Sequence, residues 1–248
     1  MGKRICKELF AEKQILFSAM ILMLIVQYAL NILQKSAHLY EDCIMDSFVW
    51  VSDSMQGTCY LIVMAAAIIE IKDSYKPDRI SRSKSLSYIW IYHVLKSGML
   101  SFVLAVFNVI GTYLVGRSAS DKLCIWDSTN SYCYFAIGKT LENVNYGLVI
   151  FTFFLSSLLG FWISALIPLL TAWYCNSYLI GAVICALINF FGEFAYVKYD
   201  TLRDVSYSNI YKGVDLRYQF IYPFLIILLF FVIGCFKNKR DFITKISR

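Results

Sequence analysis

Charged residues are scarce in this sequence, and one long stretch has none. Lys, Arg, Asp and Glu together make up 16% of the 248 residues, whereas soluble domains average about 25%. No residue between Glu142 and Glu193 carries a formal charge. A soluble core does not require such an interval, but a bilayer does, because a spanning helix needs about 20 mostly apolar residues. The scarcity of charge therefore predicts an integral membrane protein.

Histidine is also scarce, and the motifs of common enzyme classes are missing. The two histidines, His38 and His93, lie far apart, and there is no HExxH, no GxSxG and no Cys/His set with metal-ligand spacing. GlyLysThr at 138–140 lacks the earlier glycine and the preceding strand of a phosphate-binding loop. We therefore expect no catalytic, cofactor-binding or metal-binding residues in this chain, and we do not expect it to be an enzyme.

Six apolar segments are long enough to cross a bilayer. They cover approximately residues 14–33, 48–71, 97–115, 145–166, 177–197 and 218–236. Pro168 is expected to break the uncharged interval, with a tight interfacial turn over residues 168–176. Backbone in lipid must satisfy its own hydrogen bonds, and no alternating strand pattern competes. The predicted fold class is an all-α integral membrane protein with six transmembrane helices in one transmembrane domain, residues 1–248.

The segment before the first span has an amphipathic pattern. Ile5 and Leu9 share a helix face opposite Lys3 and Lys7, although Phe10 falls off that face. The pattern predicts a short interfacial helix over residues 3–13 that lies on the membrane surface.

Basic residues predict the orientation of the chain. Four lie in the N-terminal segment, five between residues 72 and 84 and five in the tail, against eight in the other loops, where acidic residues nearly balance them. The positive-inside rule then places both termini and the 72–96 loop in the cytoplasm, in a multi-pass protein of the plasma membrane. The net charge of +6 reflects this topology, so nucleic acid is not an expected partner.

A few polar residues within or near the spans are candidates for function. Asp53 and Glu193 fall in the second and fifth spans, where a charge is costly. Each could be an interfacial carboxylate or part of a polar pathway. Lys96, at the entry to the third span, is expected to extend toward the interface. No ionisable group is expected at the membrane midplane, which argues against ion-coupled transport.

Two further patterns concern cysteine and small residues. Cys124 and Cys133 share one predicted outer loop, and either a disulfide or two free thiols fits their spacing. Small residues at four-residue spacing, Ser156, Gly160 and Ser164 in the fourth span, allow close helix packing within the chain or in a dimer. Ser97, Ser101 and Ala105 form a similar row in the third span.

The whole chain resembles the permease subunits of ABC-2 type transporters. The resemblance depends on the basic N-terminal segment, six spans in about 250 residues, a long outer segment before the last span and the short basic tail at 236–242. It also depends on the pattern of the second-to-third loop: Glu70, Asp73, Pro77, Arg79, Arg82, Ser85 and Lys96. Such permeases work as homo- or heterodimers with two ATP-binding cassette subunits, which bind the ATP.

The resemblance implies that the loop 72–88 is a coupling element that docks on the ATPase. The expected coupling residues are Lys72, Lys76, Asp78, Arg79, Arg82 and Lys84. The same loop could instead anchor the protein to anionic membrane lipid. The implied function is export of an amphipathic or antimicrobial peptide. The alternatives are export of a lipid, glycan or drug, a six-span immunity or assembly protein that has no ATPase, and an intramembrane enzyme.

Overall fold

The computed structural model describes residues 13–37, 40–52, 56–71, 86–194, 207, 210 and 216–236. These residues form helices and loops, with no named strand among them. The helices are α2 (Lys13–Ala37), α3 (Ile44–Trp50), α4 (Gln56–Ile71), α6 (Leu86–Ala119), α7 (Tyr132–Ile137), α8 (Tyr146–Cys175), α9 (Tyr178–Phe194) and α11 (Leu216–Cys235). The prediction of an all-α chain is confirmed for this part of the molecule.

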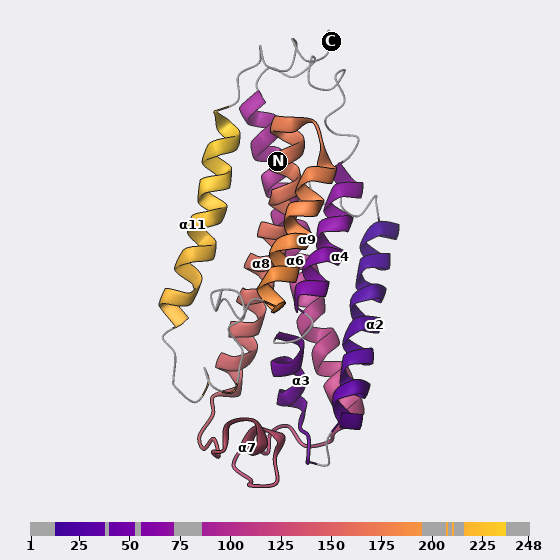
Figure 1. The fold of residues 1–248 in the computed structure, drawn as a ribbon, viewed down its shortest axis with the longest axis vertical. Coiled ribbons are helices and arrows are strands. Elements are labelled where there is room, and N and C mark those ends of the chain that lie inside the picture. Colours follow the sequence, from indigo (N-terminus) through magenta and orange to yellow (C-terminus); the bar gives the residue numbers. More distant parts are fainter. Residues whose placement is uncertain are drawn as a thin grey trace.

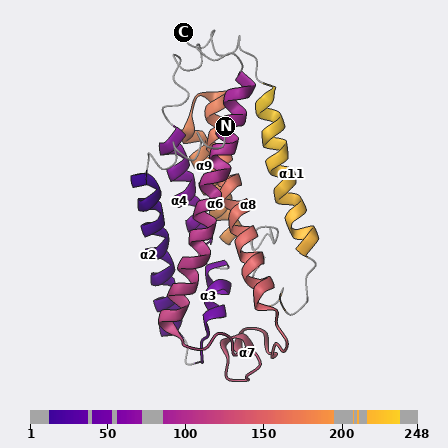
Figure 2. The same ribbon diagram turned by 180° about the vertical axis from the view of Figure 1, so that it is seen from behind.

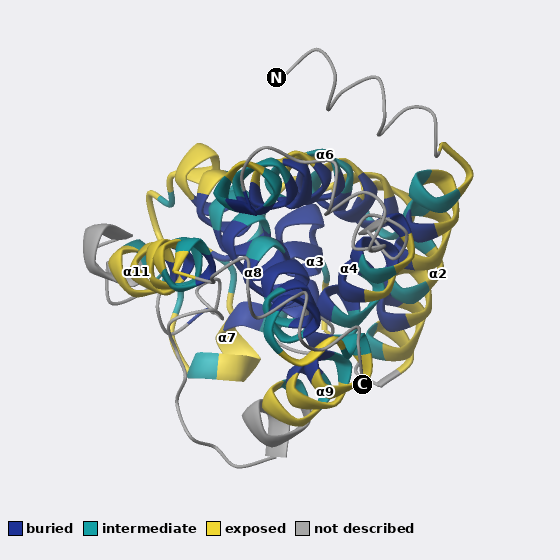
Figure 3. Cartoon of the chain, turned by 90° about the horizontal axis from the view of Figure 1, so that it is seen from above, coloured by how far each residue is buried: buried dark blue, intermediate teal, exposed yellow. Residues whose placement is uncertain are grey.

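Three of the helices are long and apolar enough to cross a membrane: α2, α6 and α8. The 34 residues of α6 extend about 51 Å at 1.5 Å per residue, which exceeds the roughly 30 Å hydrocarbon core. α4, α9 and α11 contain shorter apolar stretches. Large apolar side chains cover the outward faces of α2, α6, α9 and α11, while buried residues gather at the centre (Figure 3). These features indicate a membrane protein; a count of six spans stays a prediction.

The helices form one elongated bundle (Figure 1). α6 and α8 run through its middle, with α2 on one side and α11 on the other, and the view from behind shows the same order (Figure 2). The short helices α3 and α7 lie toward one end. We call this end the cap and define it as residues 40–52 and 120–145.

The second predicted span is not one continuous helix. α3 ends at Trp50, Val51 and Ser52 continue as a π-helical turn, and α4 begins only at Gln56. All seven residues of α3 are buried, so this segment packs inside the bundle rather than facing lipid. Asp53 lies between the two helices and outside the described residues. The predicted interfacial helix over residues 3–13 also lies outside them, except for Lys13.

The predicted turn at Pro168 is wrong, although the uncharged interval does contain two helices. Pro168 lies inside α8, which continues to Cys175. Asn176 ends the helix in the left-handed conformation, with φ 57°, and its N–H bonds to the Ala172 carbonyl at 3.1 Å. Asn tolerates this conformation at a helix terminus, and prolines are tolerated in membrane helices that neighbouring helices support. Here α9 provides the support: a Cβ added at Gly181 would overlap Pro168.

The small residues of α8 are used for packing within the chain. Ser156, Gly160 and Ser164 are all buried, and a Cβ at Gly160 would overlap the Tyr60 ring of α4. The row on α6 (Ser97, Ser101, Ala105) is fully buried as well. Of the two interpretations of these rows, the structure supports close packing between helices of one chain.

Aromatic donors attach the last turns of α11 to the bundle at the end opposite the cap. Trp90 Nε1 donates to the Phe231 carbonyl at 2.9 Å, and Trp173 Nε1 donates to the Gly234 carbonyl at 3.0 Å. The Tyr174 hydroxyl donates to the Ile233 carbonyl at 2.5 Å. The last four carbonyls of a helix lack intrahelical partners, so Trp173 satisfies the Gly234 carbonyl. The Ile233 carbonyl accepts a second hydrogen bond, from the Phe236 N–H at 3.1 Å.

Candidate functional site

The predicted coupling and pathway residues cannot be placed. Lys72, Lys76, Asp78, Arg79, Arg82 and Lys84 fall between α4 and α6, outside the described residues, as does Asp53. Glu193 belongs to α9, but its side chain is not among those described. The roles expected of these residues therefore stay predictions, and the candidate site is built from other polar groups.

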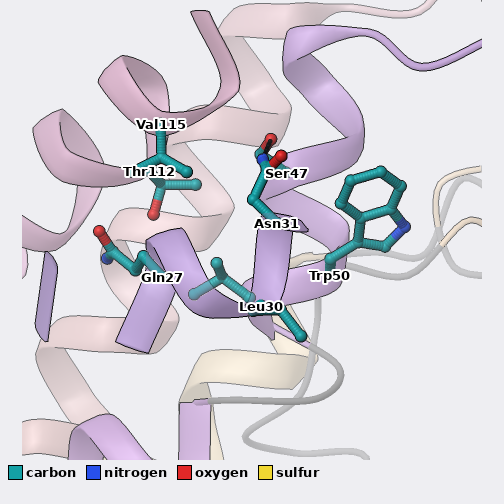
Figure 4. A pocket seen from close by; sticks show the side chains of 8 residues that line it. Gln27, Leu30, Asn31, Ser47, Trp50, Thr112 and Val115 are labelled. Atoms are coloured by element: carbon teal, nitrogen blue, oxygen red, sulfur yellow. Dashed lines mark hydrogen bonds between the residues drawn. The ribbon is translucent and has the colours of Figure 1, made fainter. Parts of the chain in front are cut away.

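A small polar pocket lies between α2, α3 and α6, toward the cap (Figure 4). Gln27 and Asn31 line it from successive turns of α2, Ser47 from α3 and Thr112 from α6. The space between these side chains is too narrow to hold a water molecule. Leu30, Trp50, Val51 and Val115 complete the wall. Four polar side chains thus converge in a bundle whose outer surface is apolar.

A chain of hydrogen bonds connects this pocket to α8. Gln27 Nε2 donates to Asn108 Oδ1 at 2.6 Å, and Asn108 Nδ2 donates to Ser157 Oγ at 3.0 Å. Beside it, Asn31 Nδ2 donates to Ser47 Oγ at 2.9 Å. All five side chains are buried. We call these five residues the polar seam; it holds α2, α3, α6 and α8 in one register.

The polar seam is not fully satisfied. Gln27 Oε1 is buried and has no hydrogen-bond partner, although the residue is only 1% exposed. A Cβ at Gly111 would come within 2.5 Å of this oxygen, so α6 approaches α2 closely here. Leaving a buried acceptor without a donor costs about 1–3 kcal/mol. A polar group retained at such a cost inside a membrane protein is by default a candidate for function.

A buried ion pair joins α4 and α6 on the side away from the cap. Lys96 Nζ lies 3.5 Å from Glu70 Oε1, and each side chain is 4% exposed. The expectation that Lys96 extends toward the interface is therefore wrong: its ammonium group is held by a carboxylate between two helices. Glu70 is one residue from the end of α4, and Lys96 lies ten residues into α6. The pair thus connects the two helices that flank residues 72–85.

The cap is organised around one buried carboxylate. Asp46 is fully buried and accepts three hydrogen bonds, from the Cys43 backbone N–H at 2.8 Å, Trp126 Nε1 at 2.7 Å and the Tyr207 hydroxyl at 2.6 Å. Burial raises the pKa of the Asp46 carboxyl, and the hydrogen bonds from Tyr207 and Trp126 oppose that shift. Asp46 therefore connects α3 to Tyr207 and to the loop of residues 120–145, which we call the outer loop after the side that the sequence predicts for it.

The thiols of the cap are not bridged in the structure. Of the two possibilities left open for Cys124 and Cys133, the structure has the two free thiols. The thiol that hydrogen-bonds to Cys124 belongs to Cys43. Elsewhere Cys59 and Cys185 are buried, as expected of small packing residues, whereas Cys175 is exposed and Cys235 is half-buried.

Sequence reasoning missed the residues of the polar seam, although a signal was present. Gln27 and Asn31 are four residues apart in an otherwise apolar helix, and Asn108 is an amide in the middle of the third predicted span. Amides in apolar spans usually face the interior of a bundle and bond across helices. Asn and Gln carry no formal charge, so a search for charged residues in the spans does not find them.

No protein-family model, curated protein or solved structure matches this chain. The site must be interpreted from its own chemistry: amides and hydroxyls in the polar seam, one ion pair and one carboxylate. Among the described residues no group of three or more His, Cys, Asp or Glu side chains could hold a metal ion. The arrangement connects α2, α3, α4, α6 and α8 through buried polar contacts.

Proposed function

We propose that this chain is the transmembrane subunit of an ATP-driven exporter of the ABC-2 type. The observation that carries the proposal is the ion pair between Glu70 and Lys96. Burying two charges costs several kcal/mol per ion unless they are paired, so the relative position of these two helix segments is fixed at an energetic cost. Residues 72–84, which include five basic residues, directly follow α4 in the sequence. Movement of the loop by an ATPase would thus reach α4 and α6 together.

The polar seam supports a role in handling an amphipathic cargo. It brings amides and hydroxyls from four helices into the membrane interior, while the outward faces stay apolar. The adjoining pocket has no room for even a water molecule, so it is not itself a ligand site of the usual size. In this proposal the cargo, an amphipathic or antimicrobial peptide, passes between two copies of the chain. A lipid, glycan or drug is a second class of cargo for the same path.

One observation favours a second candidate function. The described interior is closed, since most polar groups of the seam bond to one another. A six-span immunity or assembly protein that works without an ATPase needs no path for a substrate. The two candidates differ in their partners, because only the exporter requires an ATP-binding cassette subunit.

Affinity purification from the native membrane tests the proposal. We expect an ATP-binding subunit to be recovered with the tagged chain, and we expect the double substitution Arg79→Lys, Arg82→Lys to reduce that recovery several-fold. The charge is kept, but lysine cannot reproduce the two-pronged contacts of guanidinium. A loop that only anchors the protein to anionic lipid should tolerate the change, because each retained basic residue still contributes about 1 kcal/mol to membrane binding.

Arg117→Lys is the matched control, because Arg117 is exposed and its ionic partner among the described residues is the exposed Asp121, at 3.6 Å. This control should leave recovery of the ATPase unchanged. Recovery of no ATPase with the unmodified chain would contradict the exporter and favour the second candidate. Full recovery and full ATP hydrolysis in the Arg79, Arg82 variant would contradict the coupling role of the loop.

A further inference from the structure

Three cysteines lie together in the cap, and the chain path brings them there from distant positions. Residues 41–45 run between two parts of the outer loop. On one side the Ile44 N–H donates to the Lys122 carbonyl at 3.0 Å, and the Met45 N–H donates to the Leu123 carbonyl at 3.2 Å. On the other side Glu41 exchanges backbone hydrogen bonds with Asn130 and Tyr132. Cys43 is therefore flanked by the segments that contain Cys124 and Cys133.

The sulfur of Cys124 is the best placed nucleophile of the three. Hydrogen bonds from the Cys43 thiol, the Trp126 backbone N–H and the Tyr146 hydroxyl lower its pKa, the first of these contributing most. Cys124 is also partly exposed, whereas Cys43 and Cys133 are buried. Burial raises the pKa of the Cys133 thiol to about 12. Reactivity with an external disulfide follows thiolate character and access, so Cys124 should react first.

We propose that Cys43 and Cys124 are a redox pair that closes into a disulfide, with Cys43 rather than Cys133 as the resolving thiol. The inference uses the hydrogen bond between the two thiols and the backbone pairing of residues 44–45 with 122–123. It is independent of the proposed function. With the cap on the outer side, as the basic residues predict, the oxidant would be an extracytoplasmic disulfide, either a small molecule or a protein.

The reaction balances as two thiol–disulfide exchanges. The Cys124 thiolate attacks one sulfur of the external disulfide, which forms a mixed disulfide and releases the other half as a thiolate. That thiolate takes up the proton that Cys124 had given to water. Cys43 then attacks Cys124 Sγ, and the second half of the oxidant leaves as a thiolate that takes up the Cys43 proton. Two protein thiols are oxidised, and one external disulfide is reduced to two thiols.

The bridge would connect segments that are 81 positions apart in the chain and would act directly on the candidate site. Cys43 immediately precedes α3, whose Ser47 and Trp50 line the polar pocket. A covalent bond to the outer loop would fix the position of α3 beneath the cap. Oxidation would therefore stabilise the wall of the pocket, and the oxidised protein should melt at a higher temperature than the reduced one.

Mapping of disulfides after oxidation tests the pairing. The full chain is purified with reductant, exchanged into oxidised glutathione, quenched with a maleimide and digested without reduction. Trypsin leaves Cys124 and Cys133 on one peptide, so cleavage must also occur after Trp126 to separate them. We expect the peptide that links Cys43 to Cys124 to exceed any peptide that links Cys124 to Cys133 by at least about tenfold, the ratio that 1.4 kcal/mol of preference gives at equilibrium.

Single substitutions identify the role of each thiol. Cys133→Ala should keep the bridge, whereas Cys43→Ala should stop the reaction at a mixed disulfide of Cys124 with glutathione. Cys43→Ala keeps the backbone N–H that bonds to Asp46, so the cap retains that contact. Tyr146→Phe should slow the first step several-fold and leave the pairing unchanged. A dominant bridge between Cys124 and Cys133, or Cys124 and Cys43 both free after oxidation of the unmodified chain, would overturn the proposal.

Discussion

The two ends of the bundle satisfy their buried polar groups in opposite ways. At the cap, one acceptor serves three donors, because Asp46 receives hydrogen bonds from the Cys43 N–H, Trp126 and Tyr207. At the other end, Trp90, Trp173 and Tyr174 donate to three separate carbonyls of α11. The hydrogen bonds of the cap thus share a single acceptor side chain, whereas those at α11 use a separate donor and a separate acceptor each.

The difference predicts how much stability each end loses when one of these side chains is mutated. A carboxylate can accept several hydrogen bonds at once, so its loss strands all of its donors together. A backbone carbonyl cannot be removed by mutation, so the loss of one indole or hydroxyl donor at α11 breaks one bond only. The cap should therefore depend on one residue, and the docking of α11 should not.

Asp46→Ala should have the largest effect. It leaves the indole of Trp126 and the hydroxyl of Tyr207 buried without their acceptor, and we expect a loss of roughly 3–5 kcal/mol. Thermal unfolding in detergent and proteolysis of the outer loop measure it. Asp46→Asn is the control, since its amide oxygen still accepts, and it should cost clearly less. Equal effects of Asn and Ala would show that the carboxylate does not organise the cap.

Gly234→Ala should have the next largest effect, because a Cβ there would overlap the Trp90 indole. The displaced indole would lose both its bond to Phe231 and its contact with Trp173, whose ring centroid is 5.5 Å away. Overpacking of this kind costs about 1–3 kcal/mol. Alanine is otherwise the better helix former by about 1 kcal/mol, so a variant more stable than the original would contradict the close contact.

Tyr174→Phe and Trp173→Phe test whether the docking of α11 is distributed. Tyr174→Phe removes only a hydroxyl, and we expect it to cost about 0.5–1.5 kcal/mol. Trp173→Phe also removes part of a buried ring and should cost more. A double-mutant cycle gives their coupling energy, which should be small if each donor serves its own carbonyl. A loss for Tyr174→Phe as large as that for Asp46→Ala would remove the distinction between the two ends.

The double replacement in the polar seam should show the smallest effect. Asn108→Leu alone removes the closer acceptor of Gln27 Nε2, at 2.6 Å, and leaves it the Asn108 backbone carbonyl at 3.3 Å, whereas Gln27→Leu with Asn108→Leu replaces both partners by apolar groups. The single change should cost about 1–3 kcal/mol, and the double change should be nearly neutral. Denaturation of both variants measures the difference. A double variant as unstable as the single one would mean that the polar seam is needed for folding.

The sequence predicts the helical class and the approximate place of the six longer helices, because apolar length alone identifies segments suited to a bilayer. It predicts neither α7 nor α3 as a separate helix. It does not predict the continuation of α8 through Pro168, since the support comes from α9, which packs there at Gly181. The partner of Cys124 was missed for a similar reason. Proximity in the sequence favours Cys133, but the backbone pairing of residues 44–45 with the outer loop brings Cys43 beside it. Such contacts depend on the whole fold and leave no local signal.

In the proposed exporter, the Glu70–Lys96 ion pair transmits movement between residues 72–85 and the bundle. The most direct measurement is ATP hydrolysis by the complex carrying Glu70→Leu with Lys96→Met, together with its melting temperature. Replacing a buried ion pair by apolar residues is often neutral or stabilising. We therefore predict an unchanged or higher melting temperature, normal recovery of the ATPase and a several-fold loss of substrate-stimulated hydrolysis. Full stimulation in a correctly folded double variant would contradict the claim.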